Sequence, residues 1–228
     1  MISSYLPTVR SLPDPAIPAR TAPAGNARPT ALVVAMPQTP GTADLRTAEE
    51  EAAHVASRVP GTTVLKGVQA TSAAVRDLLP RHAWAHFACH AVSSPTDAAG
   101  GQLLLHDREL TVRDIAALRN DRAELAYLSA CETAHGPERL ADEAIHLTGT
   151  FHLAGYPHVI GTLWSIAEPV AAAVARSVYD DITTPVPDTG NTAEALHKAI
   201  REARDAAPDT PPSGRPTSTS ARDDVQGC

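Results

Sequence analysis

Hydrophobic positions form two different patterns along the middle of this chain. Continuous apolar runs, typical of buried β-strands, recur at 31–36, 62–66, 83–90, 125–130 and 158–164. Between these runs, apolar residues recur every three or four positions, which is typical of amphipathic helices, at 47–59, 71–79, 111–119, 140–155, 168–182 and 192–206. The alternation predicts an α/β fold in which helices cover both faces of a mostly parallel sheet.

Local signals support several of these elements. The helix at 47–59 carries acidic residues in its first turn, and Thr71 or Ser72 is suited to cap the next helix. Thr111 and Asp114 have the spacing of a capping box. Residues 102–106, followed by a polar turn, predict a small hairpin just before that helix.

The two ends of the chain differ in composition from the middle. Residues 1–30 contain six prolines and no apolar period, so we expect a linker or arm there. Residues 207–228 are rich in Pro, Ser and Thr, which predicts a disordered tail. One domain is therefore expected, over residues 31–206.

Composition narrows the possible partners and the compartment. The hydrophobic fraction of 43% suffices for a core, and the net charge of −7 without any basic cluster argues against nucleic-acid or anionic-membrane partners. The chain shows no signal-peptide pattern and no apolar run long enough to span a membrane. Three cysteines are too few and too odd in number for a disulfide framework, so we expect a reducing cytoplasm.

Two reactive side chains stand where predicted strands end. His90 closes the run at 83–90, and Cys131 directly follows the run at 125–130. In parallel α/β sheets the functional crevice lies beyond the carboxyl ends of the strands. If the two strands are neighbours, their ends lie about 5 Å apart, and a Cys–His pair becomes possible.

Such a pair is suited to acyl transfer, most simply amide hydrolysis. A free thiol is only a few per cent ionised at neutral pH, and an adjacent imidazole accepts its proton and later protonates the leaving amine. The backbone N–H groups of Ala91 and Cys131 are candidates to hold the oxyanion. Spacing alone leaves the ordinary alternative open, in which the thiol is a small buried hydrophobe and the imidazole a structural residue.

The remaining candidates favour structural interpretations. Cys89 faces away from His90 and is expected in the core, whereas Cys228 ends the tail and has no expected role. Ser129 lies deeper than Cys131 and is expected to be structural. His86 and His90 lie about 13 Å apart on a strand, so no metal site is expected. No motif for a cofactor is present either.

An ordered set of segments resembles one known family. The chain contains AHFACH, LTVRDIAAL, LAYLSACETAHG and LTGTFHLAGYPHVIGTLW in that order. The set is similar to the CHAT domain, a caspase-like domain often found with tetratricopeptide repeats. The similarity extends over roughly residues 2–205, including SSYLPTVRSL near the start.

The resemblance implies a caspase-like three-layer sandwich and a cysteine endopeptidase acting on a protein or peptide substrate. Cys131 then takes the place of the family's nucleophile and His90 that of its histidine. Trp164 and Ser165 are candidates to wall the substrate groove, with rim packing as the alternative for the tryptophan. Asp142 and Glu143 are candidates for an acidic specificity pocket, although acids there also suit the first turn of a helix.

The chain departs from the family pattern in three places. Ala91 stands where relatives commonly have glycine, so a positive φ there would be strained. No tetratricopeptide repeats are present, so the usual sensing module is missing or belongs to a repeat-containing or regulatory partner. The family's closing strand is not recognisable, which leaves 158–164 as an exposed edge. A catalytically inactive interaction module or a truncated remnant is therefore the alternative to an enzyme.

Overall fold

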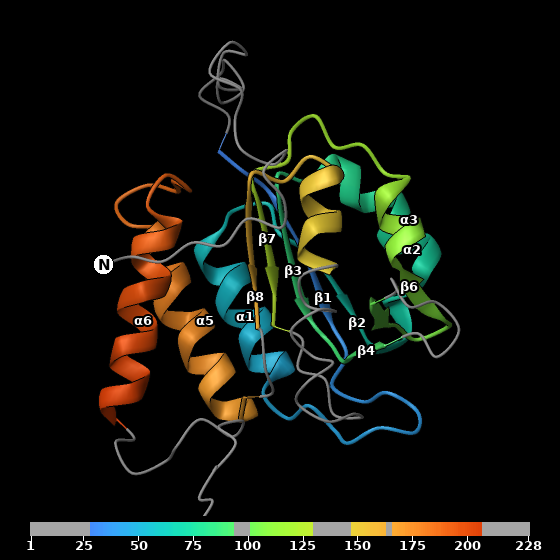
Figure 1. Cartoon of the computed structure of the whole chain (residues 1–228), viewed down its shortest axis with the longest axis horizontal. Helices are drawn as coiled ribbons and strands as arrows, with labels where there is room; N and C mark the ends of the chain where they lie inside the picture. Colours follow the sequence, from blue (N-terminus) through green and yellow to red (C-terminus); the bar gives the residue numbers. More distant parts are fainter. Residues whose placement is uncertain (1–27, 94–100, 130–146, 163–165, 207–228) are drawn as a thin grey trace, which may run out of the picture.

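The structure is a computed structural model that describes residues 28–93, 101–129, 147–162 and 166–206. At its centre lies a five-stranded parallel sheet in the order β2-β1-β3-β7-β8 (Figure 1). Its strands are β1 (Ala31–Ala35), β2 (Thr63–Lys66), β3 (Trp84–Ala88), β7 (Leu125–Leu128) and β8 (His158–Gly161). Each of the five apolar runs in the sequence forms one strand, so the predicted α/β fold is confirmed.

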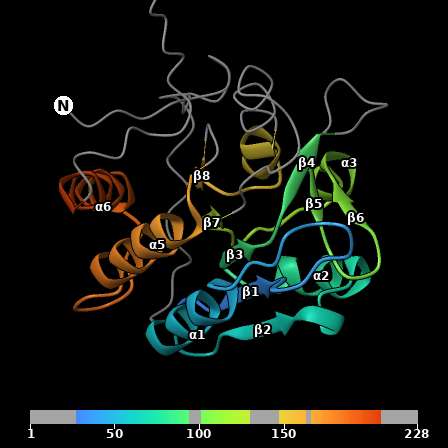
Figure 2. The ribbon, with the colours of Figure 1, turned by 90° about the horizontal axis from the view of Figure 1, so that it is seen from below.

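Helices cover both faces of this sheet, as expected for a three-layer sandwich (Figures 1 and 2). One face carries α1 (Ala48–Arg58), α5 (Glu168–Ile182) and, outside α5, α6 (Thr192–Ala206). The other face carries α2 (Ser72–Leu78), α3 (Val112–Ala116) and the helical residues 147–153. Two short 3-10 turns, Gly67–Gln69 and Leu79–Arg81, flank α2.

Alternate residues of each strand build two cores, one under each helical layer. In β1, Leu32 and Val34 belong to the core beneath α2 and α3, while Val33 belongs to the core beneath α1 and α5. All three side chains are fully buried. A strand buried on both faces must be apolar throughout, which explains why its sequence reads as a continuous run.

A second, three-stranded antiparallel sheet lies beside α3. It consists of β4 (Ala91–Ser93), β5 (Gly101–Leu104) and β6 (Glu109–Thr111). The predicted hairpin corresponds to β5 and β6. The predicted strand 83–90 was too long: β3 ends at Ala88, and the chain then enters β4, which the sequence reading missed. A three-residue strand that pairs with a partner about ten residues away carries too little periodicity to be recognised.

Side-chain caps fix the starts of α2 and α3. Thr71 accepts a bond from the N–H of Ala74 at 3.2 Å, and the Thr111–Asp114 capping box is present as predicted. Asp107 accepts the N–H of Ser72 at 2.8 Å, and this bond holds the pKa of the Asp107 carboxyl below its ordinary value. α3 ends at Ala116, three residues before the predicted end.

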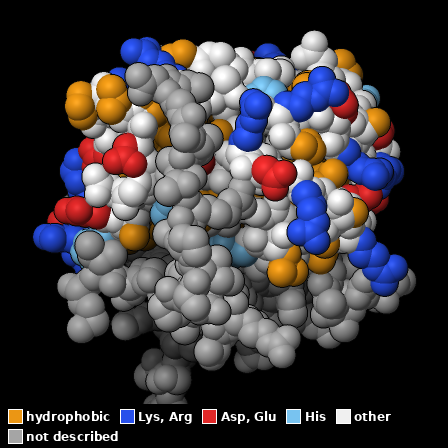
Figure 3. Space-filling model, turned by 90° about the horizontal axis from the view of Figure 1, so that it is seen from above, with side chains coloured by type: hydrophobic (Ala, Val, Ile, Leu, Met, Phe, Trp, Pro, Cys, Tyr) orange, Lys and Arg blue, Asp and Glu red, His pale blue; other side chains and the backbone are white. Residues whose placement is uncertain are grey.

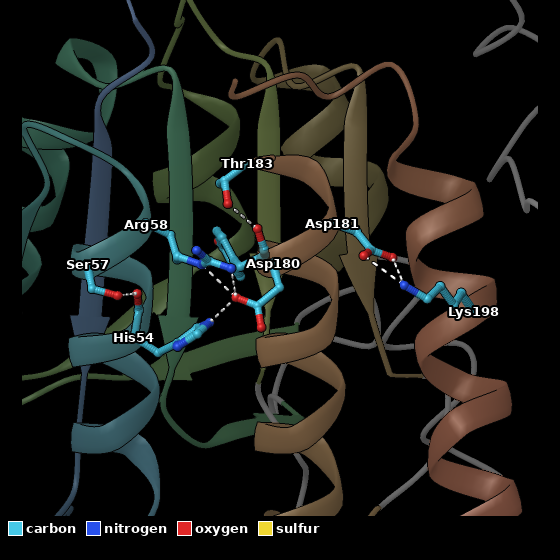
Figure 4. Close-up of polar contacts among 8 residues, drawn as sticks. His54, Ser57, Arg58, Asp180, Asp181, Thr183 and Lys198 are labelled. Atoms are coloured by element: carbon cyan, nitrogen blue, oxygen red, sulfur yellow. Dashed lines mark hydrogen bonds and ion pairs between the residues drawn. The ribbon is translucent and has the colours of Figure 1, made fainter. Parts of the chain in front are cut away.

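Ion pairs connect the helices of the outer layer (Figure 4). Asp180 of α5 faces α1, where its Oδ1 lies 3.0 Å from Nε2 of His54 and 2.6 Å from Nε of Arg58. The neighbouring Asp181 faces α6 and accepts from Nζ of Lys198 at 2.8 Å. These partly exposed pairs orient the helices and add little stability individually.

The end of the sheet at which the strands begin carries charged side chains of both signs (Figure 3). Strands run downward in Figure 1, so Figure 3 shows the end at which they begin. Acidic and basic side chains lie interspersed over the described part of that surface.

At the side of the sheet, β8 pairs only with β7 among the described residues and forms an edge there. Within the described ranges, no helix is long and apolar enough to cross a membrane.

Candidate active site

The candidate site lies where β3 and β7 end. These strands are adjacent, parallel and in register from Trp84 opposite Leu125 to Phe87 opposite Leu128. Every pair in this register is separated by 41 residues, which is also the separation between His90 and Cys131 in the sequence. The sequence left open whether the two strands are neighbours, and the structure shows that they are.

His90 is almost completely buried just beyond β3, with 1% of its surface exposed. Its Nε2 lies 2.8 Å from the carbonyl oxygen of Ala43, in the segment that joins β1 to α1. Its Nδ1 is buried and finds no hydrogen-bond partner among the described residues.

This contact determines which nitrogen of His90 is basic. A carbonyl oxygen only accepts hydrogen bonds, so Nε2 must carry a proton and donate it to Ala43. In the neutral ring Nδ1 then holds the free lone pair. A buried imidazole held in one orientation with one free lone pair is suited to act as a base.

Ala91, which stands where relatives commonly have glycine, has the ordinary backbone of a strand residue at the start of β4. The N–H of Leu104 donates to the carbonyl of His90 at 2.8 Å, and Ala91 is paired with Leu103. Because bonded and non-bonded pairs alternate along an antiparallel ladder, the N–H of Ala91 points away from β5. No non-glycine residue in the described ranges has a positive φ, so alanine is accommodated here without that strain.

A small pocket opens on the α1/α5 side at the same end of the sheet. The residues that line it include Ala88 of β3, Ser129 after β7, Thr47, Glu51 and Glu168. Ala88 lies two residues before His90, and Ser129 lies two residues before Cys131. Both strand ends that carry the predicted pair therefore border this pocket.

Glu51, which lines the pocket, also forms a buried pair with His86 of β3. Glu51 Oε1 lies 2.7 Å from His86 Nε2, although neither atom has the alignment of a hydrogen bond. The His86 ring stacks on Tyr127 with centroids 5.1 Å apart, and its Nδ1 lies 3.2 Å from the hydroxyl of Tyr179. Burial, together with the charges of Tyr127 and Glu51, raises the pKa of Tyr179 well above its ordinary value.

Cys89 is a core residue, as predicted. Its side chain is fully buried on the opposite side of the sheet from His86, in the cluster that contains Phe87. Burial raises the pKa of the Cys89 thiol to about 12, so this thiol stays protonated at neutral pH. Ser129 lines the pocket and is half-buried.

The other predicted site residues lie outside the described residues. They are Cys131, Asp142, Glu143, Trp164 and Ser165. Their roles stay predictions from the sequence.

The sequence reading missed three residues that shape this site, namely Ala43, Glu51 and Glu168. Ala43 acts through its backbone, which leaves no sequence signal. Glu51 does carry one, because it lies three residues after Ala48 and four before Val55, on the buried stripe of α1. Glu168 reads as an ordinary first-turn acid, and its partner Thr47 lies 121 residues away.

Comparisons with known proteins give two similarities. A crystal structure of protein GSU0716 from Geobacter sulfurreducens matches with a TM-score of 0.37 and 18% identity, over 48% of this chain and 52% of that one. The match thus spans about half of that protein. None of the curated proteins compared with this sequence matches it. The model of the CHAT domain family matches residues 2–218, and the chain therefore belongs to that family.

Proposed function

We propose that this chain is a cysteine endopeptidase domain in which Cys131 is the nucleophile and His90 is the general base and acid. The observation that carries the proposal is the register of β3 and β7, whose pairs are 41 residues apart. His90 follows Phe87 by three residues and Cys131 follows Leu128 by three, so the two residues come equally far along the chain beyond two adjacent, in-register strands.

The orientation of His90 supports the same assignment. Its Nε2–H donates to Ala43, so Nδ1 is the nitrogen available to a thiol. In the proposed reaction Nδ1 takes the thiol proton, and the thiolate sulfur attacks the peptide carbonyl carbon. The backbone N–H groups of Ala91 and Cys131 are the candidate donors to the resulting oxyanion.

The remaining steps return the enzyme to its starting state. The proton on Nδ1 passes to the leaving amine as the C–N bond breaks, which leaves a thioester on Cys131. Nδ1 then takes a proton from a water molecule while the water oxygen attacks the thioester carbonyl carbon. The C–S bond breaks, the proton on Nδ1 passes to the sulfur of Cys131, and the carboxylic acid product is released. Each proton removed by His90 is thus given back within one turnover.

A peptide carrying an electrophilic ketone in place of the scissile bond tests the proposal directly. Intact-protein mass spectrometry of the chain with Cys89→Ala and Cys228→Ser should show one covalent adduct, absent in Cys131→Ala and formed slowly in His90→Ala. A folded chain that forms no adduct across a library of such peptides would favour an inactive interaction module instead.

A further inference from the structure

The start of α5 is joined directly to the start of α1. Oε1 of Glu168, the first residue of α5, accepts the N–H of Thr47 at 2.5 Å and the Thr47 hydroxyl at 3.0 Å. Thr47 is the N-cap of α1, and its own side chain makes no capping bond to that helix. A single carboxylate oxygen therefore accepts from both hydrogen-bond donors of Thr47.

The chemistry of helix ends favours this contact. The first N–H groups of a helix lack partners within it, and the positive end of the helix dipole attracts a carboxylate. Glu168 lies in the first turn of α5 while it accepts from the N-cap of α1. One carboxylate thus faces the N-terminal ends of two helices.

Thr47 ends the segment that holds His90. This segment begins after β1, and four residues before Thr47 it presents the carbonyl of Ala43 to Nε2 of His90. The side chains of Ala43, Asp44 and Arg46 are exposed, so they contribute little packing to the position of the backbone.

Several backbone bonds also restrain the segment. Met36 donates to the carbonyl of Ala88 at 2.9 Å at its start, and Ala48 and Glu51 of α1 donate to the carbonyls of Leu45 and Thr47 at its end. Leu45 donates to the carbonyl of Pro37 at 2.9 Å, and Thr42 donates through its N–H to the carbonyl of Thr39 at 3.2 Å. Both bonds lie within the segment and fix its shape, whereas the bond from Thr47 to Glu168 ties it to another helix. Glu168 thus connects α5 to the segment whose Ala43 carbonyl meets His90.

We infer that Glu168 is a positioning residue for His90. By holding Thr47 it keeps the Ala43 carbonyl in place, which keeps the His90 proton on Nε2 and leaves Nδ1 as the base. This inference rests on the proposed function, because it assigns Glu168 a role in the reactivity of Cys131. Glu168 also borders the pocket, but its described bonds are directed to Thr47.

The test compares alkylation rates of Cys131 at pH 7 in the chain with Cys89→Ala and Cys228→Ser. Glu168→Ala should lower the rate about tenfold, since small displacements of a catalytic group have effects of at least this size. Glu168→Gln should leave the rate nearly unchanged, because its amide oxygen still accepts both bonds. The matched control is Glu194→Ala, which removes an exposed first-turn acid from α6 and should leave the rate unchanged.

Two further measurements separate positioning from a loss of folding. Nitrogen-15 NMR of labelled histidine should show the Nε2–H form of His90 in the unsubstituted chain and in Glu168→Gln, and a mixture of tautomers in Glu168→Ala. If Glu168→Ala fails to fold, Thr47→Ala decides. That variant removes only the hydroxyl bond, so the chain should stay folded with a small drop in its thermal midpoint and should alkylate about threefold more slowly.

The outcomes distinguish this inference from the proposed function. If His90→Ala leaves the alkylation rate unchanged, the Cys131–His90 pair itself is wrong. If His90→Ala slows the reaction but Glu168→Ala and Thr47→Ala do not, the pair stands and the positioning role of Glu168 is overturned.

Discussion

The imidazole of His90 and the carbonyl of Ala43 are 47 residues apart in sequence and 2.8 Å apart in the structure. Because a carbonyl oxygen only accepts, Nε2 carries the ring proton and Nδ1 has the free lone pair, in a ring that is 1% exposed. Nothing about an alanine predicts such a role, because only its backbone oxygen takes part. The orientation of the candidate base is thus set by the path of the chain between β1 and α1.

Removing Glu51 from its buried pair with His86 should destabilise the fold strongly. Both side chains are nearly inaccessible, at 5% and 0% exposed, so Glu51→Ala leaves a buried imidazole without its acidic partner. We expect the free energy of unfolding to fall by about 3–5 kcal/mol, measured by urea denaturation. On the same helix, His54→Ala breaks a partly exposed pair with Asp180 and should cost less than about 1 kcal/mol. Equal losses for the two variants would contradict this prediction.

Two histidines near the start of β8 should make the fold sensitive to acid. Burial lowers the pKa of His152 and of His158. Electrostatic repulsion from His152 lowers the pKa of His158 further. The unfolded chain then binds more protons than the folded one, so stability is lost as pH falls below the ordinary value of 6.5. His158→Gln should therefore flatten the decline of the thermal midpoint between about pH 7 and pH 5.

The exposed His106 supplies the control for that measurement. His106→Gln should leave the pH dependence of the thermal midpoint as it is in the native chain. If His106→Gln flattened the curve as much as His158→Gln does, burial of His158 would not be the cause.

Gly161 should be required where β8 passes the helical residues 147–153. A Cβ at this position would lie 2.8 Å from Cγ2 of Thr148, which is closer than a Cβ atom comes to another carbon in a folded protein. Gly161→Ala should therefore lower the free energy of unfolding by about 1–3 kcal/mol. Adding Thr148→Ser removes that methyl group and should restore most of the loss. If the second substitution gives no recovery, the close contact is not the reason for the glycine.

Cys89 should be unreactive in the folded chain. Its thiol is fully buried with a pKa raised to about 12, so little thiolate forms and reagents do not reach it. Peptide mass spectrometry after iodoacetamide treatment at pH 8.5 should find Cys89 unmodified until denaturant is added. Labelling of native Cys89 as fast as Cys228 would contradict its assignment to the core.

Strand and helix positions could be predicted because each element repeats its pattern many times. The bounds of α5 and α6 match the predicted ranges, since their apolar stripes extend over 15 residues each. The ends of β3 and α3 were predicted less well. β3 ends at Ala88 and the chain turns into β4, which pairs with β5 outside the main sheet, and α3 ends at Ala116. The facing of Phe87 and Cys89 away from His86 followed from strand alternation alone.

The surroundings of the site could be predicted only in part. The strand ending singled out His90, whereas the adjacency of β3 and β7 was left open by the sequence and comes from the structure. The bonds from Ala43 to His90 and from Glu168 to Thr47 join residues 47 and 121 positions apart, and no local pattern encodes such contacts. Glu51 was assigned to the polar first turn of α1 because acids are common there, whereas its helical spacing with Val55 indicates burial.

The most direct test of the central claim is the alkylation rate of Cys131 between pH 5 and pH 9, with and without His90→Ala. Cys89→Ala and Cys228→Ser are present throughout, so only one thiol reports. The account predicts a rate that is already high near pH 6–7 and falls at least tenfold without His90. A slow rate that rises only above about pH 8, and is the same in both chains, would mean an unactivated thiol and would contradict the proposed function.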